Sequence, residues 1–176
     1  MDIAENSVAA CAKNIQMIAR ANTLKDRLYL AVIDDGNGMD AEMAATVIDP
    51  FVTSRTTRKV GLGIPLLKAA AEACEGWLVV KSAPGEGTQI MVEFCYSHID
   101  RMPMGDLPST WLALLVSYPA IHWTFKYSIN DDCYDFDDQD IKEALGDISL
   151  TEPDILAFLR STLQEGFQEI NAIHTY

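Results

Sequence analysis

Two pairs of glycines bracket a segment rich in basic and hydroxyl side chains. The first pair, Gly36 and Gly38, follows an apolar run that ends at Asp34. The second pair, Gly61 and Gly63, directly precedes a helical pattern. Glycine lets a backbone approach a ligand closely because it has no Cβ, and a helix start offers N–H groups and a positive dipole end to phosphate. This pattern predicts a nucleotide-binding site.

The segment between the glycine pairs carries cationic donors. Arg55, Arg58 and Lys59 can neutralise the charge of a triphosphate. The alternative is a solvated cationic loop. The chain has no G-x-x-x-x-G-K-[ST] run, and neither glycine pair has the third glycine of the dinucleotide fingerprint. These absences exclude a P-loop and leave Rossmann binding without support.

Five short segments resemble, in order, the boxes of the GHKL superfamily, which includes gyrase, heat-shock chaperones, histidine kinases and mismatch-repair ATPases. They are Asp2-Ile-Ala-Glu-Asn6-Ser7, Asp34-x-Gly36-x-Gly38, Asp49-Pro50-Phe51, Gly61-Leu62-Gly63 and Gly85-Glu86-Gly87-Thr88. Each alone is a weak signal, but the ordered set over roughly the first 95 residues makes a chance match improbable. The resemblance implies the Bergerat ATP-binding fold, a two-layer α/β sandwich of the α+β class with a mixed sheet and helices on one face.

The resemblance assigns magnesium and the chemical step to the first segment. Asn6 would bind the magnesium that bridges the phosphates, and Asp2 would act as general base on the attacking water or hydroxyl. The two residues are one helical turn apart and therefore on one face. The family more often has glutamate as the base, and structure normally precedes this helix, so we expect an N-terminally shortened domain. Asp2 can alternatively be an ordinary first-turn carboxylate.

The resemblance assigns adenine to the end of the apolar run. Asp34 would accept a hydrogen bond from the exocyclic amine, unless it only caps the turn. Gly36 and Gly38 would let the backbone pass beneath the base. Thr88 would lie near the base, or it is simply a β-favouring residue that opens a strand.

The second glycine pair is expected to bind phosphate. Gly61 and Gly63 would donate backbone N–H groups, with Leu62 between them packed in the core. Arg55 and Lys59 would add charge from the preceding segment. The cofactors implied are therefore ATP and Mg²⁺.

Composition excludes several classes of function. A net charge of −13 in 176 residues argues against general binding of nucleic acid or acidic membranes. Four scattered cysteines without a C-x-x-C motif indicate reduced thiols rather than a zinc site or a disulfide framework. No signal peptide or membrane-length apolar run is apparent, so we expect a cytoplasmic protein.

The resemblance implies an ATP-binding domain over residues 1–97, and residues 98–176 are expected to form an α+β extension of unknown role. Hydrophobic periodicity predicts the elements of each part. The first contains a helix at 2–12, a hairpin at 14–33, helices at 40–48 and 64–75, and strands at 77–82 and 88–95. The second contains a helix at 106–118, a strand at 121–127, an acidic turn at 130–138, a helix that stops at Gly146, and a final helix after a capping box at 151–154.

Three functions agree with this pattern. The first is a magnesium–ATP module that hydrolyses ATP slowly, or uses it as a conformational switch on a partner protein, with a homodimer possible. The second is a protein kinase, resembling anti-sigma-factor or histidine kinases, that phosphorylates a partner. The third is a non-catalytic nucleotide sensor. The segment from Ser97 to Pro103 superficially resembles a histidine-kinase phosphoacceptor box, but Ile99 stands where an acidic residue should follow His98.

Overall fold

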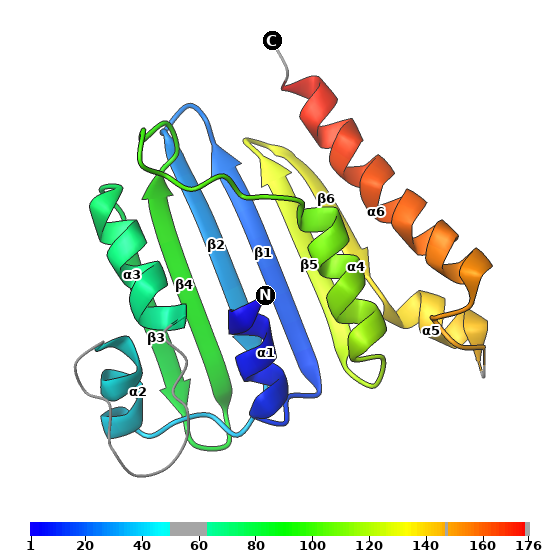
Figure 1. Ribbon diagram of the computed structural model, residues 1–176, viewed down its shortest axis with the longest axis horizontal. Coiled ribbons are helices and arrows are strands. Elements are labelled where there is room, and N and C mark those ends of the chain that lie inside the picture. Colours follow the sequence, from blue (N-terminus) through cyan, green and yellow to red (C-terminus); the bar gives the residue numbers. More distant parts are fainter. Residues whose placement is uncertain (50–62, 147, 175–176) are drawn as a thin grey trace.

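The computed structural model describes residues 1–49, 63–146 and 148–174. Within these residues the strands form one six-stranded sheet in the order β3-β4-β2-β1-β5-β6 (Figure 1). β1 and β5 run parallel, and every other neighbouring pair is antiparallel. The predicted mixed sheet is therefore confirmed. The strands are β1 (Asn14–Asn22), β2 (Arg27–Asp34), β3 (Trp77–Ala83), β4 (Gly87–Cys95), β5 (His122–Ile129) and β6 (Asp132–Asp137).

Helices cover one face of this sheet, which confirms the predicted two-layer arrangement. Figure 1 shows α1, α3 and α4 lying across the strands, with α6 beside the β6 edge. None of the helices in the described part of the chain is long and apolar enough to cross a membrane. The helices are α1 (Asp2–Ala9), α2 (Ala41–Ile48), α3 (Gly63–Ala73), α4 (Leu107–Ser117), α5 (Gln139–Leu145) and α6 (Pro153–Ile173).

Alternation along the strands determines which face is covered. Leu28 of β2 lies opposite Phe94 of β4, and both side chains are buried. Arg27 and Glu93, each one residue away, point to the other face and form an ion pair there of 3.8 Å. Because successive side chains of a strand point to opposite faces, the same alternation buries one row of apolar residues from each strand under the helices.

The segment after residue 97 completes the same sheet. β5 pairs with β1 in parallel register, and α4 and α6 pack on the face that α1 and α3 also cover. An aromatic cluster holds this half together: Trp111 stacks on Phe125 at 4.6 Å between ring centroids, and Phe167 of α6 stacks on Tyr127 at 4.1 Å. The division of the chain into two domains at residue 97 stays a prediction.

Three local predictions are wrong. The acidic turn at 130–138 is mostly a strand, β6, which pairs with β5. The capping box before α6 is absent, because the N-cap is Glu152 without a side-chain cap and the Thr151 hydroxyl bonds to Ser149 instead, at 2.7 Å. The first helix ends at Ala9 rather than near residue 12, because Cys11 has φ 61° and the backbone leaves the helical region there.

Candidate functional site

Asp34 is a buried carboxylate held by three hydrogen bonds. It ends β2 and is 7% exposed. Oδ2 accepts the Ser7 hydroxyl of α1 at 2.5 Å. Oδ1 accepts the N–H groups of Gly36 at 2.9 Å and Thr88 at 3.2 Å. A buried carboxylate with this many donors is fixed in direction, because its own contacts leave it little freedom to rotate.

Thr88 lies beside this carboxylate, and its place near a base stays a prediction. It is 8% exposed, and its hydroxyl shares a hydrogen bond of 2.9 Å with Ser82 of β3. Ser82 in turn donates to the carbonyl of Gly87 and accepts the N–H of Met39. The β3–β4 hairpin is thus fastened to the segment that follows Asp34.

Gly36 and Gly38 occupy positions where the chain passes close to other backbone. A Cβ on Gly36 would lie 2.8 Å from the carbonyl oxygen of Ala10. A Cβ on Gly38 would lie 1.9 Å from the carbonyl oxygen of Ala83, and its φ of +66° also favours glycine. The close backbone contacts here are with the protein itself; the role of these glycines beneath a base stays a prediction.

Asp2 and Asn6 extend the site along α1. Both are exposed, and they lie one turn apart. Gly63, the first residue of α3, adjoins Asp2: a Cβ on this glycine would lie 3.6 Å from Oδ2 of Asp2. The fold therefore brings the start of α3 next to the carboxylate predicted to be the general base. Ser7 continues the same helix to Asp34.

Four of the predicted site residues lie outside the described residues. They are Arg55, Lys59, Gly61 and Leu62. The structure therefore brings together the predicted residues of α1, β2, β4 and the start of α3.

Asp35, the residue after Asp34, contacts the start of β1. Its carboxylate accepts the N–H groups of Lys13 at 2.7 Å and Asn14 at 2.8 Å, and the side-chain amide of Asn14 at 2.6 Å. Burial raises the pKa of Asp35, but these hydrogen bonds outweigh burial and lower it. Asp35 therefore remains a carboxylate that ties the end of β2 to the start of β1.

Sequence reasoning missed Ser7, Ser82 and Asn14. Ser7 lies in the first of the GHKL-like segments, and the resemblance assigns it no role. A serine or asparagine is common in loops and helix ends, so its type alone carries no signal. Each acts through a partner distant along the chain: Ser7 through Asp34, Ser82 through Thr88 and Met39, and Asn14 through Asp35.

A family model decides what this arrangement is. Residues 1–98 match the family described as "Histidine kinase-, DNA gyrase B-, and HSP90-like ATPase". The chain belongs to this family. The match covers α1 to β4 and includes Asp2, Asn6, Asp34 and Thr88. The chain thus carries an ATPase module of the histidine-kinase-like type, and the fold predicted from the sequence is confirmed.

The curated relatives are signalling proteins. "Sensory histidine kinase/phosphatase NtrB" of Rhodobacter capsulatus is 41% identical over 58 residues, 33% of this chain and 16% of that protein. "Sensor protein kinase FleS" of Pseudomonas aeruginosa is 38% identical over 88 residues, 50% of this chain and 22% of that protein. The chain therefore spans less than a quarter of the length of either relative.

One solved structure extends over more of the chain. The "N terminal domain of a DNA repair protein" covers 77% of this chain and 49% of its own, with 12% identity and a TM-score of 0.48. A "histidine kinase domain from Erythrobacter litoralis EL346 blue-light activated histidine kinase" covers 49% of this chain and 35% of its own, with 17% identity and a TM-score of 0.34.

Proposed function

We propose that this chain binds magnesium–ATP and uses it, by slow hydrolysis or by a conformational switch, to regulate a partner protein. The observation that carries the proposal is the buried, oriented carboxylate of Asp34 in a chain of the histidine-kinase-like ATPase family. Oδ2 of Asp34 accepts one hydrogen bond, from Ser7. A carboxylate oxygen can accept a second, and the exocyclic amine of adenine supplies such a donor.

The exposed face of α1 fits a magnesium ion. Asn6 offers an amide oxygen and Asp2, one turn away, a carboxylate. Mg²⁺ prefers oxygen donors, takes few of them from the protein and retains several waters. In this proposal Asn6 ligates the ion, which when bound neutralises charge on the phosphates, and Asp2 accepts a proton from the attacking water or hydroxyl.

The remaining assignments follow the same proposal. Gly63, with Gly61 and Leu62, would present backbone N–H groups to phosphate at the start of α3, and Arg55 and Lys59 would add positive charge. The position of Gly63 beside Asp2 supports this, because it sets the helix start next to the carboxylate that would act on the terminal phosphate.

The experiment is calorimetric titration with ATP and magnesium of the wild type, Asp34→Asn and Asp135→Asn. Asp135 is an exposed carboxylate of β6, 3.5 Å from Lys126, so its substitution makes the same chemical change far from the site. We expect saturable ATP binding, weakened about tenfold or more in Asp34→Asn because a charged acceptor is lost, and unchanged in Asp135→Asn. Absence of binding to wild type, or equal binding to all three, contradicts the proposal.

Phosphoryl transfer to a protein is the second candidate, favoured by the sensor kinases among the relatives. Incubation with γ-labelled ATP separates the two chemistries, because hydrolysis releases labelled phosphate and transfer labels a protein. His98 is half-buried after β4, and its Nδ1 accepts the N–H of Asp100 at 3.2 Å. If the chain labels itself at His98, the label disappears in His98→Gln. Label that persists in this variant excludes His98 as the acceptor.

A further inference from the structure

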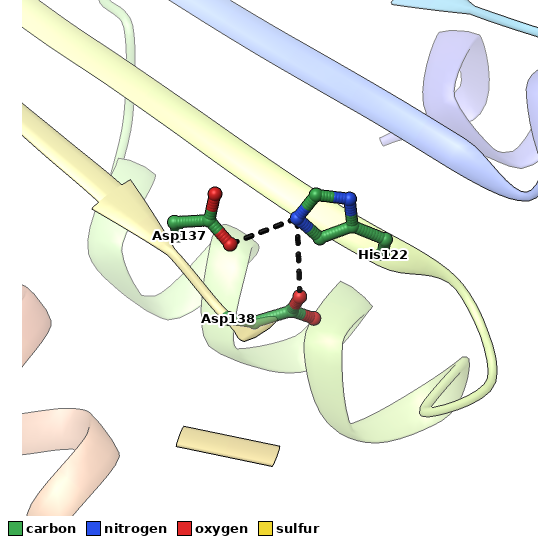
Figure 2. A group of neighbouring side chains, drawn as sticks. All are labelled: His122, Asp137 and Asp138. Atoms are coloured by element: carbon green, nitrogen blue, oxygen red, sulfur yellow. Dashed lines mark hydrogen bonds and ion pairs between the residues drawn. The ribbon is translucent and has the colours of Figure 1, made fainter. Parts of the chain in front are cut away.

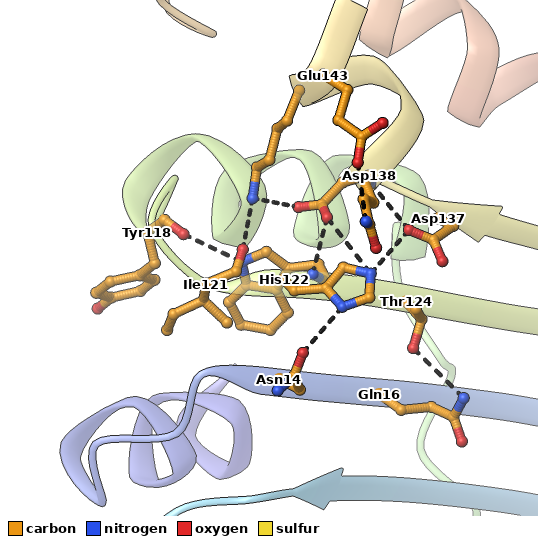
Figure 3. Close-up of polar contacts among 12 residues, drawn as sticks. Asn14, Gln16, Tyr118, Ile121, His122, Thr124, Asp137, Asp138 and Glu143 are labelled. Atoms are coloured by element: carbon orange, nitrogen blue, oxygen red, sulfur yellow. Dashed lines mark hydrogen bonds and ion pairs between the residues drawn. The ribbon is translucent and has the colours of Figure 1, made fainter. Parts of the chain in front are cut away.

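His122 lies between the start of β1 and the start of α5. Its Nε2 is 2.8 Å from Oδ1 of Asp137 and 3.9 Å from Oδ1 of Asp138 (Figure 2). Its Nδ1 is 3.0 Å from Oδ1 of Asn14 (Figure 3). The side chain is 31% exposed, beside a pocket of 420 Å³ that Asn14 and Asp138 also line. The ring therefore contacts three elements at once and is partly open to solvent.

The amide of Asn14 determines which ring nitrogen carries a hydrogen. Its Nδ2 donates to Asp35, which is an acceptor only, so its Oδ1 must face the ring. Nδ1 of His122 therefore has to be the donor in this contact.

Nε2 then faces a carboxylate. Without a hydrogen on Nε2, its lone pair would lie 2.8 Å from the carboxylate oxygen of Asp137, which is repulsive. The arrangement is satisfied when both ring nitrogens are protonated. Burial raises the pKa of Asp137, but hydrogen bonds from Gln139 and His122 outweigh burial and lower it, in agreement with an ionised carboxylate.

The surrounding charges balance around a protonated ring. Nζ of Lys142 lies 2.5 Å from Oδ2 of Asp138, whose carboxylate is 1% exposed. Burial raises the pKa of Asp138, although the hydrogen bond and charge of Lys142 act in the opposite direction. Asp138 thus pairs with the ammonium of Lys142, and Asp137 pairs with the imidazolium. Glu143, also beside the pocket, is exposed and accepts from Gln139 at 2.9 Å.

The same three side chains place ligand atoms within 4.8 Å of one another, which suggests a metal site. The carboxylate oxygens nearest the ring each accept a backbone N–H, however, so the site already contains hydrogen-bond donors. Oδ1 of Asp137 accepts the N–H of Gln139 at 2.9 Å, and Oδ1 of Asp138 accepts the N–H of Trp123 at 3.1 Å. One proton on the ring completes the bonding, so the contacts favour a proton over a metal ion.

We propose that His122, as an imidazolium, is a positioning residue of the nucleotide site. It holds Oδ1 of Asn14, keeps the Asn14 amide donating to Asp35, and so fixes the residue that directly follows Asp34. This inference rests on the proposed function for its effect on ATP, and it links the segment after residue 97 to the adenine side of the site.

Deprotonation of His122, or its replacement, would affect the nucleotide site through Asn14. A neutral ring keeps only one of its two contacts, because the single hydrogen serves either Asn14 or Asp137. If the hydrogen stays on Nε2, which faces Asp137, the bare Nδ1 and Oδ1 of Asn14 are two acceptors, so this contact is lost. Asp35 retains the backbone N–H groups of Lys13 and Asn14. The effect on the loop is therefore a loosening rather than a collapse.

The test compares His122→Gln with His174→Gln. His174 pairs with Asp132 at 2.9 Å, at the opposite end of β6 from Asp137, so its substitution removes a histidine–carboxylate pair of the same kind. In nucleotide-free protein, we expect nuclear magnetic resonance at pH 6 to show both ring nitrogens of His122 protonated. His122→Gln should shift the amides of Lys13, Asp35 and Gly36, and His174→Gln should leave them in place.

Three spectra would overturn the proposal. One is a neutral His122 ring at pH 6. Another is an amide change in His122→Gln that stops short of Asp35 and Gly36. The third is coordination of added Zn²⁺ by the His122 ring at equimolar metal, which would assign a metal site. Each outcome is read without nucleotide, so it decides the positioning role independently of ATP binding.

ATP titration at pH 6 measures the consequence. His122→Gln should bind ATP about fivefold more weakly than wild type, at the low end of coupling between sites. His174→Gln should follow wild type. Equal affinity of all three proteins overturns the positioning role but leaves the ATP function intact, whereas no binding to wild type overturns the ATP function itself.

Discussion

The hydroxyl of Ser7 donates a hydrogen bond of 2.5 Å to Oδ2 of Asp34 and joins the first helix to the end of β2. Both residues are buried, and they are 27 positions apart in the chain. Asn6, next to Ser7, is the proposed magnesium ligand, and Asp34 is the proposed adenine acceptor. This hydrogen bond thus helps to fix the proposed magnesium ligand relative to the proposed adenine acceptor.

Replacing Ser7 by alanine should destabilise the protein. It leaves a buried carboxylate oxygen without its donor, which costs about 1–3 kcal/mol of the free energy of unfolding. It should also weaken ATP binding, because Asp34 can then rotate. Urea unfolding and calorimetric titration measure the two effects.

Ser161→Ala is the matched control for Ser7→Ala. The Ser161 hydroxyl also contacts a carboxylate, that of Glu165, at 2.5 Å, but both side chains are exposed on α6. We expect little change in stability or affinity, because water replaces an exposed donor. Similar losses in the two variants would mean that burial of the Ser7–Asp34 pair is immaterial.

Substitutions of Asp2 and Asn6 should have different effects, one on turnover and the other on ATP affinity. Asp2→Ala removes the proposed general base and should lower turnover by about 10²-fold or more with little change in ATP affinity. Asn6→Ala removes a proposed magnesium ligand and should weaken binding mainly when magnesium is present. Steady-state phosphate release and titration with and without magnesium distinguish them. Glu5→Ala, an exposed change on the same helix, should do neither. Unchanged turnover in Asp2→Ala would show that Asp2 is not the general base, and ATP binding without any turnover in wild type would favour the non-catalytic nucleotide sensor.

The aromatic cluster should make the last helix part of the main unfolding transition. Phe167 is 5% exposed and stacks on Tyr127, so Phe167→Ala should lower the free energy of unfolding by about 3–5 kcal/mol. Phe158→Ala removes the same ring from the same helix where it is 56% exposed, and should cost far less. Urea unfolding followed by far-ultraviolet circular dichroism and by tryptophan fluorescence checks this. Two separate transitions would show that the segment after residue 97 unfolds on its own.

Local patterns predicted the elements wherever alternation and burial agreed. β4 is an example, because Ile90, Val92 and Phe94 alternate with residues of the other face and are buried in the structure. β6 was missed because its acidic residues resemble a turn. It becomes a strand through its neighbour: Phe136 is buried opposite Phe125, and Asp135 pairs with Lys126 on the other face.

The sequence predicts only those residues of the candidate site that lie in recognisable motifs. Asp34 and Thr88 could be proposed from the sequence because glycines mark their segments. Ser7, Ser82 and Asn14 could not be found, since each depends on a contact with a distant segment rather than on spacing along the chain. Hydrogen bonds between distant segments are a property of the packed structure, and sequence position alone does not specify them.

Asp106 should make the stability of α4 depend on pH. Its carboxylate caps the helix by accepting the hydroxyl of Ser109 at 2.6 Å and the N–H of the same residue at 3.0 Å. These hydrogen bonds, the hydroxyl first, lower the pKa of Asp106 below its ordinary value. A carboxyl with a lowered pKa in the folded state stabilises that state fully above the ordinary aspartate pKa, and the contribution disappears as the pH falls through the lowered pKa.

Asp106→Ala should therefore lower the Tm at pH 7, and the difference from wild type should shrink below pH 4. Asp106→Asn keeps an acceptor oxygen for the cap but cannot ionise, so its Tm difference from wild type should be smaller than that of Asp106→Ala at pH 7. A constant difference between wild type and Asp106→Ala across this pH range, measured by thermal unfolding, would show that the charge of Asp106 does not contribute.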